Sequence, residues 1–142
     1  MKLSKKSRYA LEALVYMTLY SDGKPMKAGE VAAGMEISAG YLEQIFFRLR
    51  KTGFLKTVRG KSGGFLLAAP AEETTAGGVV RALEGTLVPV ACAENLSACT
   101  SPVRDRCVTR WLWVRMSDEI GRILDGMTLR SLADSFLQED GQ

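Results

Sequence analysis

The sequence has 142 residues, of which 46% are hydrophobic and 25% are charged, so it can form one domain with a substantial core. It contains no histidine, which excludes the Ser–His and Cys–His pairs of nucleophilic enzymes, and we therefore expect no enzyme. The net charge of +3 is unevenly distributed, since residues 1–67 carry +7 and residues 68–142 carry −4. A basic N-terminal half favours a polyanionic partner.

The N-terminal residues predict two helices joined by a turn. Ser4 is a suitable N-cap for a helix over residues 5–20, which is apolar on most sides and should lie in the core. Residues 21–25, Ser-Asp-Gly-Lys-Pro, predict a turn. A short helix over residues 27–33 follows, and Gly34 lies where a helix commonly ends in a left-handed residue.

A third helix and a glycine-rich hairpin come next. Ser38 is a good N-cap, Gly53 ends the helix, and the spacing of one face predicts a buried stripe of Leu42, Ile45, Phe46 and Leu49. Residues 54–58 and 65–69 predict two short strands. Between them lies a basic tip with the sequence Arg-Gly-Lys-Ser-Gly-Gly.

The second half of the chain predicts a helix ending near Gly85, an extended segment over residues 86–91, and then a polar loop. This loop holds all three cysteines of the chain, Cys92, Cys99 and Cys107. Ser101-Pro102 is a typical helix start, and apolar residues at helical spacing continue to about Asp125, which predicts a helix of about 24 residues. A short last helix begins at Thr128.

This order of elements is that of a winged helix-turn-helix protein. We therefore predict a mainly α fold with a two-stranded wing and a long C-terminal dimerisation helix. Residues 1–85 would form the DNA-binding domain and residues 86–108 a cysteine-containing cluster loop. Residues 101–137 would form the dimerisation helix and a short C-terminal helix.

The third helix and the wing carry the residues expected to contact double-stranded DNA. Opposite its apolar stripe, the helix presents polar and basic side chains, of which Gln44 can pair with adenine. Glu43 could accept a hydrogen bond from cytosine or face solvent. The predicted contact residues are Ser38, Tyr41, Gln44, Arg48, Lys51, Arg59 and Lys61. The alternatives are a solvated helix face beside a plain turn, or a winged helix that binds proteins as an adaptor.

Three clustered cysteines predict metal binding or redox chemistry. No signal peptide or membrane span is recognisable, so we expect a cytoplasmic protein, a compartment in which structural disulfides are uncommon. The thiols could hold an iron–sulfur cluster or zinc, act as a thiol switch, or be incidental. Zinc is disfavoured because structural zinc sites usually contain a CxxC-type pair and four protein ligands.

Long stretches of the chain resemble the IscR/NsrR-type winged-helix regulators, the Rrf2 family. The resemblance rests first on the run from Ser38 to Leu55 and the run from Val58 to Ala68. The opening residues 1–10 and the stretch from Cys107 to Trp113 are also similar, and the likeness extends to about Leu137.

The resemblance implies a homodimer on a partly palindromic operator, with the long helices crossing at the interface. It also implies that Cys92, Cys99 and Cys107 hold an iron–sulfur cluster, either 2Fe–2S or 4Fe–4S, whose state sets the affinity for DNA. We therefore predict a transcriptional repressor that senses redox state, nitric oxide or iron–sulfur supply. A thiol-based regulator without a cluster is the alternative.

The sequence departs from the family pattern at the position of the fourth cluster ligand. Arg110 stands where the IscR branch usually has a ligand histidine, and Arg8 stands where other members have an acidic ligand. The fourth ligand is therefore open between a partner-subunit residue, a small exogenous molecule, and Glu94, Asp105 or Glu12. Gly40 replaces a hydroxyl residue common in the IscR branch, so we expect a different base preference.

Overall fold

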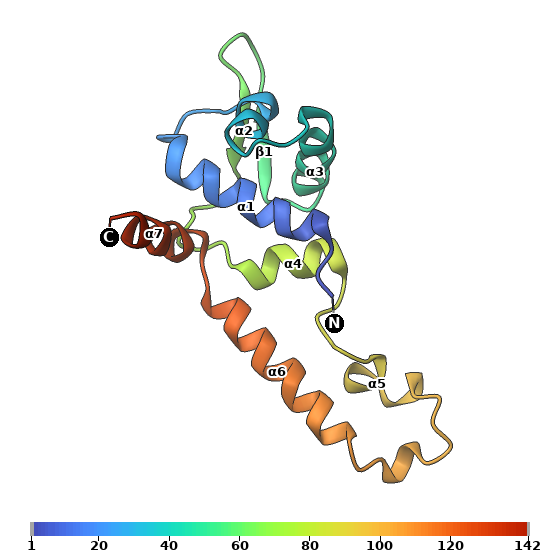
Figure 1. Ribbon diagram of the computed structural model, residues 1–142. Coiled ribbons are helices and arrows are strands. Elements are labelled where there is room, and N and C mark those ends of the chain that lie inside the picture. The colour runs from blue at the N-terminus through green and yellow to red at the C-terminus, as the bar shows by residue number, and fades with distance from the viewer. Residues whose placement is uncertain (1, 142) are drawn as a thin grey trace.

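A computed structural model describes residues 2–141. The helices and strands are α1 (Lys5–Tyr20), α2 (Ala28–Gly34), α3 (Ala39–Lys51), β1 (Leu55–Val58), β2 (Gly64–Leu67), α4 (Ala76–Glu84), α5 (Ala91–Glu94), α6 (Arg110–Gly126) and α7 (Leu129–Asp140). Two short 3-10 turns, Leu96–Ala98 and Arg104–Arg106, lie between α5 and α6. The predicted mainly α fold with a two-stranded wing is confirmed (Figure 1).

The core forms around α1, which lies between α3 with the wing and the C-terminal helices (Figure 1). Ala10, Leu14 and Met17 of α1 are at most 1% exposed. The predicted apolar stripe of α3 is confirmed, since its four residues Leu42, Ile45, Phe46 and Leu49 are fully buried. Within residues 2–141, no helix is both long enough and apolar enough to cross a membrane.

The junction between α2 and α3 depends on one close approach to α1. Ser38 caps α3 as predicted, because its hydroxyl accepts a hydrogen bond from the Tyr41 amide at 3.3 Å. The expectation that Gly34 takes a left-handed conformation is wrong: Gly34 is the last residue of α2, and Glu36 is the left-handed residue, with φ 56°. Gly34 is needed instead because the Tyr16 ring occupies the space that a Cβ would fill.

The wing is a hairpin anchored to the linker before α2. In the antiparallel register, Leu55 pairs with Leu67 and Val58 with Gly64, so both strands are shorter than predicted. Phe65 forms two backbone hydrogen bonds with Met26, at 2.7 and 2.9 Å. At Gly64 a side chain would collide with the Met26 backbone, so a glycine allows the wing to pack this closely.

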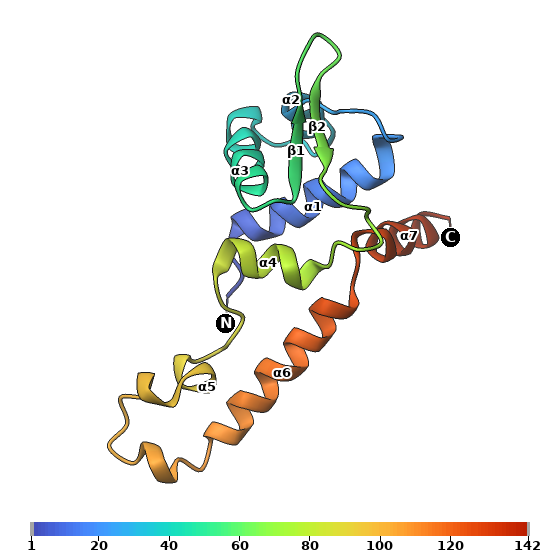
Figure 2. The same cartoon turned by 180° about the vertical axis from the view of Figure 1, so that it is seen from behind.

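The C-terminal helices divide into a packed part and a projecting part. Leu129 and Ala133 of α7 are fully buried, and α7 packs against α1. Helix α6 contacts α4 at one end and otherwise extends away from the body, with the α5 loop at its far end, opposite the wing (Figures 1 and 2).

Helix α6 is shorter than the sequence predicts. It begins at Arg110 rather than at Ser101-Pro102 and has 17 residues. The Ser101 hydroxyl instead accepts a hydrogen bond from the Val103 amide at 3.3 Å, which closes a local turn. Cys107 is extended, with φ −66° and ψ 115°, and this interrupts the path from that turn to α6.

Candidate nucleic-acid interface and cysteine loop

The outer face of α3, defined here as Gly40, Glu43, Gln44, Phe47, Arg48 and Lys51, is exposed along its whole length. It lies opposite the buried stripe, so the fold does not use these side chains for its core. Neither Arg48 nor Lys51 forms an ion pair with another residue of the described range 2–141. Two cations and one carboxamide are therefore available to a ligand at this surface.

Ser38 and Tyr41 hold the start of α3 in place. The exposed Ser38 hydroxyl is engaged in the N-cap hydrogen bond. The Tyr41 ring is half-buried and packs edge-to-face on Tyr9 of α1, with ring centroids 5.8 Å apart. Both residues therefore position the N-terminus of the helix, the end from which recognition helices contact base edges.

The wing tip carries the remaining predicted contact residues. Arg59 and Lys61 are exposed beyond the last strand pair, Val58–Gly64. Between them Gly60 has a φ of 110°, a conformation that favours glycine. The hairpin thus presents two cations on a narrow turn, at the end of the molecule remote from the cysteine loop (Figure 2).

Three further residues near the outer face of α3 were not identified from the sequence. Phe47 and Arg50 are exposed on α3, and Lys6 of α1 joins Gly40, Glu43, Gln44, Phe47 and Arg48 around an open hollow of about 590 Å³. Phe47 follows Gln44 by three residues, so helical periodicity places it on the same face. Its apolar character suggested the core, which explains why it was overlooked.

The three cysteines share the loop between α4 and α6. Cys92 lies in α5, whereas Cys99 and Cys107 each follow a 3-10 turn. All three are free and half-buried. Across residues 2–141, no three or more cysteine, histidine, aspartate or glutamate side chains gather closely enough to hold a metal ion. The loop therefore contains the thiols without assembling them into a ligand set.

The surroundings of Cys107 favour its thiolate. The Thr109 hydroxyl lies 3.5 Å from the Cys107 sulfur, and hydrogen bonding to Thr109, aided by the Arg110 backbone and charge, lowers the pKa of the Cys107 thiol. Cys107 and Arg110 also line an open hollow of about 400 Å³, together with Leu96, Arg104, Asp105, Arg106, Trp111 and Val114. Three arginines, Arg104, Arg106 and Arg110, thus line the same hollow as the Cys107 thiol.

The protein residues considered as a fourth ligand are dispersed. Glu94 accepts a hydrogen bond from the Thr86 hydroxyl at 3.2 Å, and Asp105 lies 3.9 Å from Arg104. Glu12 lies on α1 and lines a different hollow, between α1 and α7. Arg110 Nε donates to the Cys92 carbonyl at 3.3 Å, so Arg110 bridges the two ends of the loop.

Polar contacts tie helix α4 to both α1 and α6. The Glu84 carboxylate, at the end of α4, accepts hydrogen bonds from the Ser4 amide at 2.9 Å and the Ser7 hydroxyl at 2.5 Å. Hydrogen bonds from Ser4 and Ser7 lower the pKa of Glu84. Arg81 of α4 binds Asp125 of α6 through two hydrogen bonds of 2.5 and 2.9 Å. Helix α4 is therefore tied both to the start of α1 and to the base of α6.

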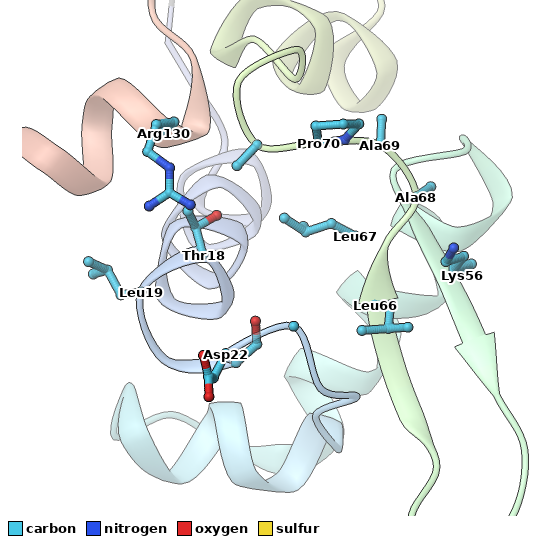
Figure 3. Close-up of a pocket in the computed structure, with 13 residues that line it drawn as sticks. Thr18, Leu19, Asp22, Lys56, Leu66, Leu67, Ala68, Ala69, Pro70 and Arg130 are labelled. Carbon is cyan, nitrogen blue, oxygen red and sulfur yellow. The ribbon is translucent and has the colours of Figure 1, made fainter.

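Another hollow, of about 680 Å³, lies between the end of α1, strand β2 and the start of α7 (Figure 3). Its charged side chains are Asp22, Lys56 and Arg130. It contains no cysteine and none of the predicted DNA-contacting residues, so it belongs to neither candidate site.

Comparisons with known proteins agree with this architecture. Residues 3–135 match the family Rrf2, described as "Iron-dependent Transcriptional regulator". The "HTH-type transcriptional regulator IscR" of Serratia proteamaculans is 36% identical over 135 residues, which cover 95% of this chain and 80% of that protein.

Solved structures similar to this chain include proteins named CymR and IscR. CymR, described as the global cysteine regulator of B. subtilis, has a TM-score of 0.77 and 32% identity, covering 95% of this chain and 98% of that one. IscR of T. potens has a TM-score of 0.76 and 28% identity, covering 95% of this chain and 88% of that one. The relatives are named as regulators and not as enzymes, which confirms the expectation from the missing histidines.

Proposed function

Because this chain belongs to the Rrf2 family of transcriptional regulators, we propose that it represses transcription by binding a two-fold operator with α3 and the wing. The outer face of α3 is the observation that carries the proposal, since it is exposed and cationic on a helix whose opposite side is fully buried. There Gln44 can bond an adenine edge, and Arg48 and Lys51 can reach bases or phosphates. Arg59 and Lys61 would lie beside the minor groove.

A homodimer is proposed because α6, within residues 2–141, packs mainly on α4 near one end and on α5 near the other and leaves much of its surface uncovered. None of its residues is buried, and Trp111 and Ile123 are 70% and 61% exposed. Leu112, Met116 and Ile123 fall within an arc of about 40° on the helix, so these exposed side chains form one apolar stripe. Pairing of two α6 helices would bury this surface and set two α3 helices at a spacing of about 34 Å, one turn of DNA.

We further propose that Cys92, Cys99 and Cys107 hold an iron–sulfur cluster. The chemistry of the donors fits, because three thiols lie in one loop with Arg104, Arg106 and Arg110 available to offset the charge of thiolates and sulfides. When bound, a cluster of this kind supplies an iron centre whose redox state and ligands respond to oxidants or nitric oxide.

Hydrogen bonds within the chain would transmit a change in the conformation of this loop to α6 and to the end of α4. Closing the three thiols into one ligand set requires the loop to rearrange from the arrangement described above. Arg110, through the Cys92 carbonyl, and Glu94, through Thr86, tie the loop to α6 and to the end of α4. A rearrangement of the loop would therefore shift α6 and alter the way the two subunits pair.

A thiol switch without a cluster is the second candidate. Two observations favour it: the three cysteines are free and not gathered, and the similar structures include CymR as well as IscR. In this case oxidation of two loop thiols to a disulfide would change the loop, with the electrons passing to a cellular oxidant such as a peroxide.

DNA binding is tested by measuring the affinity of the full chain for promoter fragments as a function of salt concentration. We expect a steep decrease with salt, and a shallower slope for the Arg48→Ala/Lys51→Ala variant. Arg122→Ala, which removes a cation from α6, is the matched control and should keep the slope. A flat response of the wild-type protein would indicate a protein-binding adaptor instead.

The two cysteine proposals are separated by purification without oxygen. The cluster proposal predicts coloured protein with iron and sulfide, and their loss in a Cys92→Ser/Cys99→Ser/Cys107→Ser variant. Colourless, iron-free protein whose DNA affinity changes on reversible oxidation would support the thiol switch and reject the cluster. Equal operator affinity for the wild-type protein and the triple variant under all conditions would show that neither a cluster nor a thiol switch at these cysteines controls DNA binding.

A further inference from the structure

Phe47 is an exposed aromatic ring that the fold does not require. It is 50% exposed, whereas Leu42, Ile45, Phe46 and Leu49 of the same helix are fully buried. The core is therefore closed without it. A single exposed apolar side chain is common on protein surfaces, so its position and its neighbours decide whether it has a role.

Phe47 lies at the centre of the outer face of α3. With about 100° between successive helical residues, Gly40, Gln44, Phe47 and Lys51 fall within an arc of about 60°, directly opposite the buried stripe. On a recognition helix this arc is the part that enters the major groove most deeply. The ring therefore belongs to the row that meets base edges, beside Gln44.

Two cations lie near the ring, which also borders an open hollow. The Arg50 guanidinium carbon is 5.5 Å and the Lys51 ammonium 5.1 Å from the ring centroid, within the range of cation–π attraction. Phe47 also lines the hollow together with Gly40, Glu43 and Gln44. Gly40 leaves it open, since the nearest atom to a Cβ at this position is the Ser38 hydroxyl at 3.9 Å. A small apolar group could enter there and contact the ring while the flanking cations meet phosphates.

We infer that Phe47 reads the C5-methyl group of a thymine in the operator. In the major groove of unmodified DNA, this methyl is the apolar group that a base edge presents, and apolar side chains distinguish thymine by contacting it. Gln44, three residues earlier, can form its two hydrogen bonds with an adenine at a neighbouring step. The inference rests on the proposed DNA binding and adds a specificity-determining contact to it. Each half-site thus contains a thymine whose methyl, rather than its hydrogen-bonding groups, is recognised.

The test replaces thymine by uracil, which keeps base pairing and removes only the methyl group. A tight-binding duplex is first selected from a randomised pool with the full-length wild-type protein, and uracil is then placed at each thymine in turn. We expect one position per half-site at which uracil weakens wild-type binding by about fourfold, the effect of one buried methyl, and about fifteenfold when both half-sites are changed. Uracil at other positions should have little effect.

The variant Phe47→Ala completes a double-mutant cycle. It should bind the thymine duplex more weakly and lose its discrimination between thymine and uracil at that position, while its thermal unfolding stays unchanged because the ring is exposed. Tyr20→Ala, which removes another exposed ring (55%) at the far end of α1, should keep full discrimination. Wild-type protein that binds every uracil duplex as tightly as thymine would overturn the inference, as would a Phe47→Ala variant that still discriminates. Failure to select any duplex would instead reject the proposed DNA binding.

Discussion

Cys107 differs from an ordinary exposed thiol because Thr109 and Arg110 follow it at the entrance to α6. We predict that Thr109→Val slows alkylation of Cys107 severalfold at neutral pH, because the lost hydroxyl no longer holds the thiol pKa down. Mass spectrometry of metal-free protein across a pH series would show the midpoint of the reaction at higher pH. Thr109→Ser keeps the hydroxyl and should react like the wild type; an unchanged midpoint in Thr109→Val would contradict the assignment.

Gly34 and Gly29 occupy the same short helix and have opposite expected responses to alanine. Gly34→Ala must displace the Tyr16 ring, which packs against Tyr20 with centroids 4.6 Å apart, and we expect it to destabilise the protein by about 1–2 kcal/mol. At Gly29 no atom lies within 4 Å of a Cβ, so Gly29→Ala should be neutral or stabilising by about 0.5 kcal/mol. Urea unfolding would measure both, and equal stabilities would refute the role of Tyr16.

At the scale of single residues, sequence reasoning worked where residue type and spacing were sufficient. Gln44, Arg48 and Lys51 are exposed as helical periodicity predicts. Gly34 was misinterpreted because its role depends on Tyr16, which a local pattern does not connect to it. Phe47 was missed because a phenylalanine in an amphipathic helix is more often buried than exposed.

Among the elements, α4 binds both α1 and α6, and Glu84 makes the link to α1 pH-dependent. The folded state lowers the pKa of Glu84, so its ionised form stabilises the fold above the unfolded-state value of about 4.3, and this contribution disappears as the pH falls through the lower, folded-state pKa. We expect Glu84→Gln to be less stable than the wild type by about 1 kcal/mol at pH 7, a value that allows for solvent screening. The difference in the free energy of unfolding between the two proteins should decrease as the pH falls below the folded-state pKa.

Urea unfolding of both proteins at pH 7 and in a series below pH 5 would measure this effect. Glu73→Gln, a change at an exposed carboxylate, is the control and should match the wild type throughout. A deficit in Glu84→Gln that persists at the lowest pH would show that lost packing, and not the charge, is responsible.

Element boundaries were predictable where a cap and an apolar stripe coincide, as at Ser38 and the stripe of α3. The start of α6 could not be predicted in this way, because the serine of Ser101-Pro102 closes a local turn and the chain is extended at Cys107. The links through Glu84 and Arg81 were also beyond sequence reasoning. They join residues 80 and 44 positions apart, which no periodicity connects.

For the whole molecule, the exposed face of α6 predicts that the active species is a dimer. Ile123→Glu would place a charge in the proposed interface, and we expect a monomer whose operator affinity falls by about a hundredfold, because two linked half-sites become one. Light scattering after size-exclusion chromatography would report the mass. Arg122→Gln, on the adjacent and 72% exposed side chain, should remain dimeric. Dimeric Ile123→Glu protein would place the interface elsewhere.

The projection of α6 has a mechanical consequence. Its 17 residues span about 26 Å, so a rotation of about 5° at the end held by Arg81 displaces the opposite end by about 2 Å. The far end of the helix, with the cysteine loop, lies on the side away from the wing (Figure 1). If α3 and the wing bind DNA and the cysteine loop responds to a chemical signal, as proposed above, the loop would remain exposed to that signal on the bound protein. Release from the promoter would then not have to wait for spontaneous dissociation.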